Sequence, residues 1–571
     1  MSDNKNLFLA IALSLLVLIG WSWFADRWIP TANPPSTTVE KGKSKPLPQP
    51  QAEPVPATPK VLQSRAAVLA STPRVRIETP ALQGSLNLKG AQIDDLVLLQ
   101  ERQTIDKRSP PVRLLSPLGA PGAYFARFGW SGQGIQLPGA DTVWTASAPV
   151  LTPGRPVTLA WTNATGQRFE QVVSVDNDYL FTVKQRMVNG GSAPVSVRPF
   201  GLVSRATKSA DADSWTSHVG PIGFLNGKAN YEVDWETLDE AGANGEQFTS
   251  NGGWLGFTDK YWLTALAPAG NAAITASLRK SPSGGYQADY ADAPLIVAPG
   301  QATEQDARLF AGAKELDTLY AYEKAGIPKL SYAIDWGWFY WFMIPIFQLL
   351  VWLFHATGNF GVAIICLTLI VRLIMFPIAQ KQFKSMGAMR KVQPKMKAIQ
   401  ERFKDDKQRQ QQEILKLYQQ EKINPAAGCL PILLQIPVFY ALYKVLLVSV
   451  EMRHQPFVGW IKDLSAPDPA TVLTLFGAYP WAVPSFLAIG VLPILLGVTM
   501  WLQFKLNPQQ MDPVQQQMFA IMPWVMMFIM APFAAGLQLY WVTNNILSIA
   551  QQWWLYKRYH LHYSDTHPIK T

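Results

Sequence analysis

The stretch that decides the fold is GVAIICLTLIVRLIMFPIA, residues 361–379, an apolar run whose only charged side chain is Arg372. About 20 apolar residues cross a bilayer as a helix, so a transmembrane helix over 359–379 is predicted. A charge at membrane depth costs about 2.5–3.5 kcal/mol on insertion scales and normally faces protein or water. Arg372 is therefore predicted to mark a functional path. The alternative is that its side chain extends to the headgroups, but Gln380 begins about 12 Å further along the helix.

A polar, basic segment follows at 380–424. Apolar residues at helical spacing on both sides of Asp405 and Asp406 predict an antiparallel helical hairpin, and Pro394 is expected to kink or restart its first helix. Excess Lys and Arg places the hairpin in the cytosol. These cations suit ribosomal RNA, acidic nascent chain or anionic lipid, and a solvated basic surface is an equally good interpretation. They are Lys381, Lys384, Arg390, Lys391, Lys395, Lys397 and Arg402.

The composition excludes several classes of protein. Of 571 residues, 48% are hydrophobic and 16% charged, and the net charge is +10. The usual DNA- and RNA-binding signatures are missing, so DNA is not an expected partner. Both cysteines, Cys366 and Cys429, lie in apolar segments without zinc-site or CxxC spacing. Neither a metal nor another cofactor is predicted.

The N-terminal part of the sequence predicts a membrane anchor followed by a linker. Leu7 to Phe24 is an uncharged run of spanning length. A cleaved signal peptide is the alternative, but the run is longer than a usual signal core and has no small-x-small cleavage motif. We predict a signal-anchor helix over 1–29 with a cytosolic N-terminus. Residues 30–60 are rich in Pro, Ser and Thr and are predicted to form an extended linker.

Residues 61–330 show short alternating strands. The segment 168–187 is the clearest hairpin, with two alternating runs around an Asp-Asn-Asp turn. Many strands separated by Gly and Pro turns predict a large periplasmic β-sandwich. Such domains can bind or process sugars. His218 is the only histidine in the region and no His/carboxylate pair accompanies it, so no catalytic residue and no enzymatic activity are predicted.

A very aromatic segment, Trp336–Phe354, precedes the first central span. Its Trp and Tyr density, with Pro345 and Gln348, favours an amphipathic helix on the periplasmic membrane face over 331–356; a helix that crosses the membrane is the alternative. A membrane core over 357–558 is then predicted to contain five spans, at 359–379, 425–450, 484–504, 516–531 and 536–556. With the anchor this makes a polytopic α-helical membrane protein with six transmembrane helices. Residues 30–358 would be periplasmic, and both termini, including the tail 559–571, cytosolic.

The predicted spans contain many polar side chains and no acidic residue that could neutralise Arg372. Such side chains often join transmembrane helices by hydrogen bonds, and that is the alternative for each one. Together with the arginine, they favour an inward-facing hydrophilic groove that admits water or an acidic segment. The predicted groove residues are Arg372, Thr368, Gln435, Gln538, Asn544 and Asn545.

Three segments then resemble a known family: TLIVRLIMFPIAQKQFKSMGAMRKVQPK (368–395), INPAAGCLPILLQIPVFYALYKVLLVSVE (423–451) and LQLYWVTNNILSIAQQ (537–552). They look like the core of the YidC/Oxa membrane-protein insertases, and the anchor and external β-domain resemble the Gram-negative form. The resemblance implies an insertase and chaperone of the bacterial inner membrane. It would act on nascent membrane proteins, alone or with the Sec translocon, without hydrolysing nucleotides.

The family's pattern also implies positions for substrate contact. The groove arginine corresponds to Arg372, with Thr368 beside it. The apolar surface along which a substrate slides corresponds to Ile436, Phe439, Met526, Ile529, Tyr540 and Trp541. This sequence departs from the family at Met526 and Ile529, where aromatic residues occur, and at Trp541, where tyrosine does. The tail is only mildly basic, so the ribosome is expected to be bound weakly, through the cytosolic loops.

Two other classes of function are possible. A transporter or channel for a small anion would use Arg372 as its binding charge, but the spans are expected to hold neither an inverted repeat nor a second charged site. A periplasmic sugar-binding protein or enzyme is disfavoured by the missing catalytic pair. The sequence therefore predicts an insertase in which an acidic flank is drawn towards Arg372 while the apolar segment moves into lipid.

Overall fold

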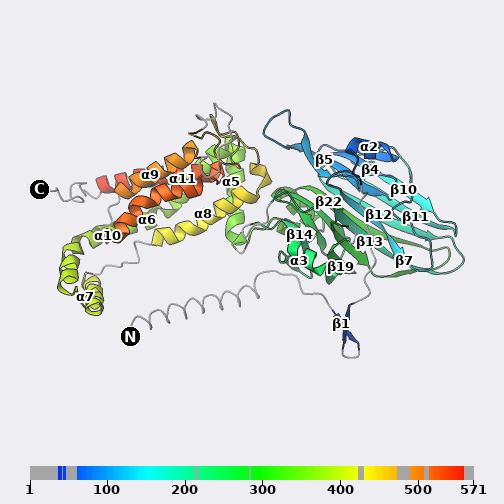
Figure 1. Ribbon diagram of the computed structural model, residues 1–571, viewed down its shortest axis with the longest axis horizontal. Helices are drawn as coiled ribbons and strands as arrows, with labels where there is room; N and C mark the ends of the chain where they lie inside the picture. The colour runs from blue at the N-terminus through cyan, green and yellow to red at the C-terminus, as the bar shows by residue number, and fades with distance from the viewer. Residues whose placement is uncertain are drawn as a thin grey trace. The chain divides into compact units, whose positions relative to one another are not determined.

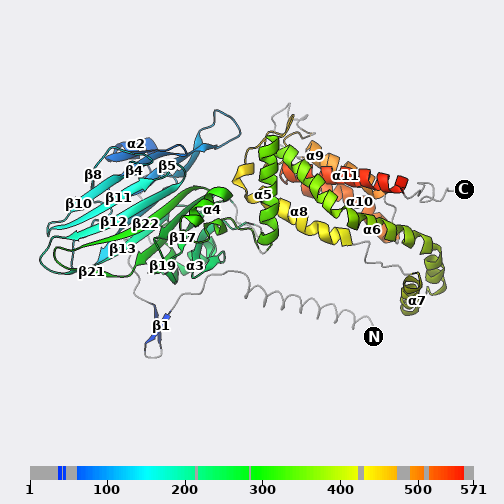
Figure 2. The same ribbon diagram turned by 180° about the vertical axis from the view of Figure 1, so that it is seen from behind.

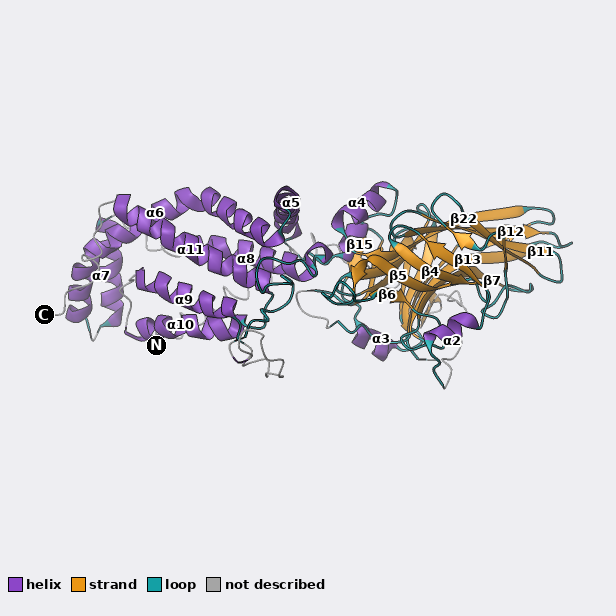
Figure 3. Cartoon of the chain, turned by 90° about the horizontal axis from the view of Figure 1, so that it is seen from above, coloured by secondary structure: helices purple, strands orange, loops and turns teal. Residues whose placement is uncertain are grey.

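The computed structural model describes residues 37–40, 43–46, 61–211, 217–281, 284–337, 339–404, 406–421, 430–471, 473, 489–506 and 513–558. Two compact units divide the chain, Met1–Trp338 and Phe339–Thr571. Figure 1 and Figure 3 show strands gathered in the first and helices filling the second. The prediction of a large β-sheet domain and a helical membrane domain is confirmed. The predicted anchor, most of the linker and the tail lie outside the described residues.

Two large sheets build the first unit. The nine-stranded sheet has the order β15 (Lys228–Asn230), β14 (Gly220–Leu225), β17 (Trp254–Thr258), β18 (Trp262–Pro268), β22 (Ala302–Ala313), β12 (Leu180–Asn189), β11 (Gln167–Val175), β10 (Val157–Thr162), β8 (Thr145–Ala146). The eleven-stranded sheet has the order β16 (Glu246–Asn251), β19 (Ala273–Lys280), β20 (Tyr286–Asp292), β13 (Val195–Arg205), β7 (Tyr124–Gly132), β5 (Gln92–Arg102), β4 (Leu82–Asn87), β3 (Arg74–Glu78), β9 (Val150–Leu151); β21 (Leu295–Val297) pairs with β13 and β6 (Pro111–Leu115) with β5. A separate hairpin joins β1 (Thr37–Glu40) and β2 (Lys43–Pro46).

The hairpin expected at 168–187 is present as β11 and β12. The two strands pair antiparallel, with Val173 opposite Val183. Alternate residues of β11 are buried, as period-two alternation predicts. Asp176 closes the turn by accepting hydrogen bonds from the backbone N–H groups of Asp178 and Leu180, both at 3.0 Å. An Asx-type turn therefore fixes the register of this hairpin.

The two sheets pack face to face around an aromatic core. Trp130 of β7 lies edge-on to Phe169 of β11, with ring centroids 5.1 Å apart. Two buried amides also cross between the sheets. Gln171 Nε2 donates to the Phe128 carbonyl at 2.8 Å, and Gln185 Nε2 donates to the Gly129 carbonyl at 2.7 Å. Buried polar groups are costly without partners, so these bonds select one alignment of the two sheets.

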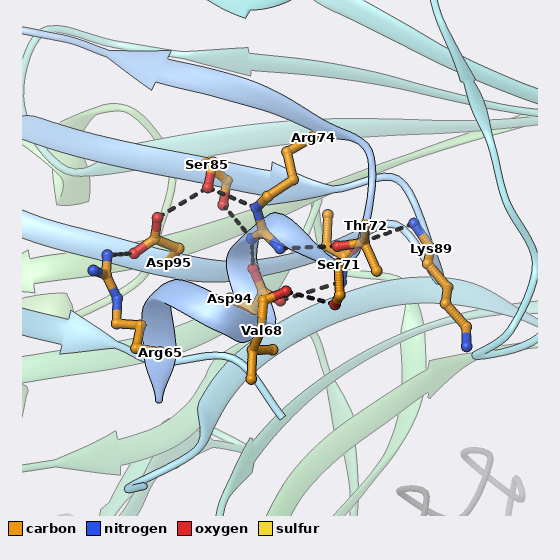
Figure 4. Close-up of polar contacts among 10 residues, drawn as sticks. Arg65, Val68, Ser71, Thr72, Arg74, Ser85, Lys89, Asp94 and Asp95 are labelled. Carbon is orange, nitrogen blue, oxygen red and sulfur yellow. Dashed lines mark hydrogen bonds and ion pairs between the residues drawn. The ribbon is translucent and has the colours of Figure 1, made fainter. Parts of the chain in front are cut away.

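A short helix, α2 (Arg65–Ala70), is attached to the large sheet by an ion pair next to a second ion pair within the sheet (Figure 4). Arg65 binds Asp95, and Arg74 at the start of β3 binds Asp94. Ser85 lies between them, accepting from Arg74 Nε at 2.8 Å and donating to Asp95 at 2.9 Å. Burial raises the pKa of Asp94 to about 6, outweighing the opposing attraction of Arg74.

Two further helices complete this unit, α3 (Trp235–Ala241) and α4 (Leu316–Lys324), followed by a 3-10 turn over Leu330–Ala333. Tyr322 of α4 donates to Asp176 at 2.6 Å, and Trp254 Nε1 donates to the Pro328 carbonyl at 3.0 Å. His218 is buried, with Nε2 2.7 Å from the Pro221 carbonyl and its ring edge-on to Tyr231. These contacts give the histidine a packing role.

The second unit is helical. Its elements are α5 (Tyr340–Thr357), α6 (Phe360–Arg402), α7 (Lys407–Gln420), α8 (Leu430–Val448), a 3-10 turn (Val450–Met452), α9 (Val491–Leu506), α10 (Pro513–Met530) and α11 (Ala535–Arg558). Helix α11 packs against α6, α8 and α9, while α10 packs on α9. In Figure 1 and Figure 2, α6, α8 and α11 run in roughly one direction and α5 runs across them. Figure 3 shows α5 nearly end-on.

Among the described residues, two helical segments are long and apolar enough to cross a membrane, Tyr340–Thr357 and Phe360–Gln380. Shorter apolar helices cover Gln435–Val448, Val491–Leu506 and Ala520–Met530. The beginnings of the spans predicted at 425–450 and 484–504 lie outside the described residues.

The predicted hairpin is formed by the end of α6 and by α7. Val392 and Leu417 are its buried centre, and Met396, Ile399 and Tyr418 pack around them. Asp406 caps α7 by accepting from the Arg409 backbone N–H at 3.1 Å, as expected for this turn. Helix α6 continues through Pro394 to Arg402, so the helix does not restart there, and a kink at Pro394 stays a prediction. A proline removes one helical hydrogen bond, and the turns on either side continue here.

Candidate functional site

Arg372 of α6 binds the neighbouring helix α11. Its Nε donates to the Asn544 side-chain oxygen at 2.8 Å, and Nη2 donates to the Asn544 backbone carbonyl at 3.2 Å. The same Nη2 also binds the Ser548 hydroxyl oxygen. All these acceptors are neutral. Among the described residues, no carboxylate forms an ion pair with Arg372, so its positive charge is solvated by dipoles and is not cancelled.

The acceptors belong to a polar stripe along α11. Tyr540, Asn544 and Ser548 are spaced four residues apart and therefore lie on one face of the helix. The hydroxyl of Tyr540 accepts a hydrogen bond from Gln435 of α8. The stripe thus joins α8 at one end and α6 at the other. Tyr540 and Ser548 are buried, whereas Asn544 and Arg372 are half-buried.

Three predicted groove residues have other partners. Thr368 is buried and its hydroxyl donates to the Ile364 carbonyl of its own helix at 2.6 Å. Gln538 donates to backbone carbonyls at the end of α10, among them that of Met530 at 2.8 Å. Asn545 donates to the Thr499 hydroxyl of α9 at 3.1 Å. Gln538 and Asn545 thus make the interhelical hydrogen bonds of the alternative interpretation, whereas the hydroxyl of Thr368 bonds within its own helix.

The residues expected to form the sliding surface divide into packed and exposed members. Phe439 of α8 contacts Trp541 of α11, with ring centroids 5.0 Å apart. Tyr540 is buried and Met526 is half-buried. Ile436 and Ile529, 56% and 52% exposed, present apolar surface outwards. A transmembrane segment can therefore contact the two isoleucines directly.

Of the predicted hairpin cations, Lys395 and Arg402 have described side chains. Lys395 forms an ion pair with Glu421 of the hairpin at 2.6 Å. The guanidinium of Arg402 lies 5.6 Å from the ring centre of Phe403. The side chains of Lys381, Lys384, Arg390, Lys391 and Lys397 lie outside the described residues.

Two residues important for this unit were missed. Ser548 binds the arginine, and its spacing from Tyr540 and Asn544 was the available signal. Lys444 lies in α8 within the predicted span 425–450 and is only 1% exposed. The expectation that the spans hold no second charged site is therefore wrong. Lys444 can be seen in the sequence, but the apolar residues around it keep the mean hydropathy of the span high.

Comparisons with known proteins agree with this architecture. Residues 74–349 match the YidC periplasmic domain family, and residues 352–562 match the 60Kd inner membrane protein family. The membrane protein insertase YidC of Zymomonas mobilis is 47% identical over 98% of this chain and 96% of its own length. That of Methylobacterium nodulans is 44% identical over 98% and 95%. A crystal structure of an active YidC insertase with its first transmembrane domain resolved is 20% identical, covers 84% of this chain and 92% of its own, and has a TM-score of 0.36.

A periplasmic β-sheet domain joined to a helical membrane unit, with both family matches, defines an inner-membrane protein insertase. The chain belongs to the YidC family of membrane protein insertases. It is a non-enzymatic protein that acts on membrane-protein substrates. The family assignment, and not the expected lack of a second buried charge, is what decides against a small-anion transporter.

Proposed function

We propose that Arg372 attracts the hydrophilic flank of a client membrane protein while the client's apolar segment leaves along α8 and α10 into lipid. The observation that carries this proposal is the neutral surroundings of the arginine. A guanidinium bound only by amide, carbonyl and hydroxyl oxygens keeps its full charge. At low dielectric that charge attracts an acidic segment more strongly than it would in water.

The path needs a polar surface next to an apolar one. The polar surface is the stripe on α11 with Arg372 and Gln435, which would line a hydrophilic groove. The apolar surface comprises Phe439, Met526 and Trp541 together with the exposed Ile436 and Ile529. A polar flank would otherwise lose its hydrogen bonds to water inside hydrocarbon, at a cost of several kcal/mol per group.

The proposed topology has six spans with both termini in the cytosol and residues 30–358 in the periplasm. Support comes from aromatic–cation pairs at the ends of two helices. Lys505 lies 5.0 Å from the ring centre of Trp501 on α9, and Arg558 lies 4.9 Å from that of Trp554 on α11. Trp and cations together are typical of the cytosolic membrane interface. These helix ends would therefore contact the headgroups of the lipid bilayer.

The segment 331–356 is proposed to lie on the periplasmic membrane face. Its helix, α5, runs across the direction of α6, α8 and α11 (Figures 1 and 3). A helix perpendicular to a membrane-spanning bundle lies in the membrane plane. Trp341 and Trp352, both more than 60% exposed, suit the headgroup level.

The Sec translocon and the ribosome are the proposed further partners, the ribosome weakly and through the cytosolic loops. The structure of the cytosolic hairpin supports the ribosome as a partner. Its two helices enclose a small apolar centre, Val392 and Leu417, and carry charged side chains on the outside. A compact basic projection of this kind can contact an acidic surface without forming a permanent complex.

Reconstitution in liposomes tests the proposed function. Two single-span clients would be compared that differ only in having aspartate or asparagine residues in the translocated flank. Arg372→Ala should lower insertion of the acidic client about tenfold and of the neutral client about twofold or less, because a charge-assisted hydrogen bond contributes roughly 1.5–3 kcal/mol. Arg372→Lys, which keeps the charge, is the matched control. An equal loss for both clients would remove electrostatic attraction from the mechanism.

A further inference from the structure

We infer that Asn544 and Ser548 are positioning residues: they hold one side of the Arg372 guanidinium with neutral oxygen atoms and leave its other terminal nitrogen, Nη1, to the client. The inference rests on the proposed role of Arg372 and deepens it. In the function proposed above, Asn544 and Ser548 enter only as parts of the polar stripe on α11.

The distribution of hydrogen bonds over the guanidinium carries the argument. Arginine presents five N–H donors in a rigid planar fork. The Nε donor is used by the Asn544 side chain, and the two donors of Nη2 are used by the Asn544 carbonyl and the Ser548 hydroxyl. Within the described part of the chain, no acceptor binds Nη1. Three of the five donors therefore bind acceptors on α11, and the two donors of Nη1 remain available to a client.

The local structure of α11 keeps these acceptors in place. Ser548 stands one helical turn after Asn544, and its hydroxyl donates to the Asn544 carbonyl at 2.7 Å. That bond uses the only proton of the hydroxyl, so the serine oxygen faces Arg372 as an acceptor. The same carbonyl also accepts from Arg372. A fixed pair of neutral acceptors, one turn apart, thus sets the orientation of the guanidinium plane.

Neutral acceptors have two consequences for a client. An acidic side chain in either place would pair with Arg372 and cancel the charge that attracts the client. The occupied side of the guanidinium also matters. A carboxylate binds arginine most tightly through two parallel hydrogen bonds, for which Nε with Nη2 is one suitable edge. With that edge filled, a client carboxylate is bound through Nη1 alone. Such a contact is weaker and suits a client that must leave again.

Two substitutions in the full-length protein, reconstituted in liposomes with the aspartate and asparagine clients, test the inference in opposite directions. Asn544→Asp places a carboxylate on Nε and should lower insertion of the acidic client about tenfold, towards the level of Arg372→Ala, with little change for the neutral client. Ser548→Ala frees one Nη2 donor, so that a client carboxylate can bridge Nη1 and Nη2. With a photoreactive residue at position 551, a half-buried position three residues after Ser548 on α11, a stalled acidic client should then give about threefold more crosslinked product. Ser548→Thr, which keeps the hydroxyl, should restore the original yield.

Asn545→Ala is the matched control, because Asn545 is the adjacent residue but binds Thr499 of α9. It should affect both clients equally. The inference is overturned if Asn544→Asp inserts the acidic client normally, or if Asn544→Asp and Asn545→Ala act alike on the two clients. It is also overturned if Ser548→Ala leaves the crosslinked yield unchanged. An equal loss of insertion for both clients in Arg372→Ala would be a failure of the proposed function. A loss selective for the acidic client in Arg372→Ala, without one in Asn544→Asp, is a failure of this inference alone.

Discussion

The carboxylate of Asp468 accepts a hydrogen bond from the backbone N–H of Leu492, 2.7 Å away in the first turn of α9. Its other oxygen accepts from Trp460 Nε1 and from the Ala470 backbone N–H, both at 3.0 Å. Asp468 is buried. A single carboxylate therefore attaches the loop after α8 to the start of a helix, where the helix dipole favours negative charge. The same loop is bound to the start of α11, since Gly536 N–H donates to the Leu464 carbonyl at 2.9 Å.

Removing this carboxylate should loosen the loop. Asp468→Ala is expected to destabilise the helical unit by about 2 kcal/mol, because three hydrogen bonds to a buried charged acceptor are lost. Denaturant titration in detergent measures the stability, and limited proteolysis measures cleavage within 451–471. Asp463→Ala is the control, since within the described residues Asp463 accepts hydrogen bonds from Ser465, nearby in sequence, and otherwise lies 4.0 Å from His454 Nε2 of the same loop. Equal protease resistance of the Asp468 variant and the parent protein would contradict the expected role.

The bond between Gln435 and Tyr540 joins α8 to α11 and carries no net charge. Tyr540→Phe should therefore cost about 1 kcal/mol of stability and reduce insertion of acidic and neutral clients alike. A double-mutant cycle with Gln435→Leu measures the pairwise contribution directly. A coupling energy near zero, or a loss confined to the acidic client, would be inconsistent with a purely structural bond.

Stability of the periplasmic unit should depend on pH through Asp94. The pKa of this carboxyl is raised by burial from 3.8 to about 6. The folded state consequently holds a proton that the unfolded state has lost between about pH 4 and pH 6, so stability falls as pH rises through that window, by up to about 3 kcal/mol. Asp292, whose pKa burial also raises to about 6, adds a change of the same sign.

Urea unfolding of a fragment spanning residues 61–337 at pH 4.5 and pH 7 checks this expectation. Asp94→Asn removes one titrating group and should reduce the loss between the two pH values by about half. Asp239→Asn is the control, because its ion pairs with Lys208 and Lys280 lower the pKa of that half-buried carboxyl, which stays ionised across the window. A pH dependence unchanged by Asp94→Asn would show that Asp94 does not titrate there.

The sequence predicts features that depend on period and length. Alternation over 168–187 predicts a hairpin, and the structure forms it. A shift of one residue in either direction would expose the apolar face of the strands to water, so the register is strongly specified. The apolar residues Met396, Ile399, Leu417 and Tyr418 likewise predict the packed hairpin of α6 and α7, whereas Val392 at its centre is not part of that prediction. The charge of Arg372 within an apolar run predicts that it needs polar neighbours, and it has them.

The partners of the polar residues are harder to predict. Asn544 and Asn545 are chemically identical neighbours, but a rotation of 100° per residue directs one to Arg372 on α6 and the other to Thr499 on α9. Gln538 binds the turn after α10 because that turn leaves carbonyls without helical partners. Choices of this kind depend on how the helices rotate against one another, which a single sequence does not specify.

The central claim is that the polar flank of a client passes next to Arg372 while its apolar segment passes Ile436 and Ile529. Site-specific photo-crosslinking of a stalled, acid-flanked client tests it most directly. With the photoreactive residue at position 551, on the same face of α11 three residues after Ser548, crosslinks should form to the flank and should disappear in Arg372→Ala. With the residue at position 436 or 529, crosslinks should form to the apolar segment in both backgrounds. Crosslinks from position 551 to the apolar segment, or crosslinks to the flank that persist without Arg372, would contradict the account.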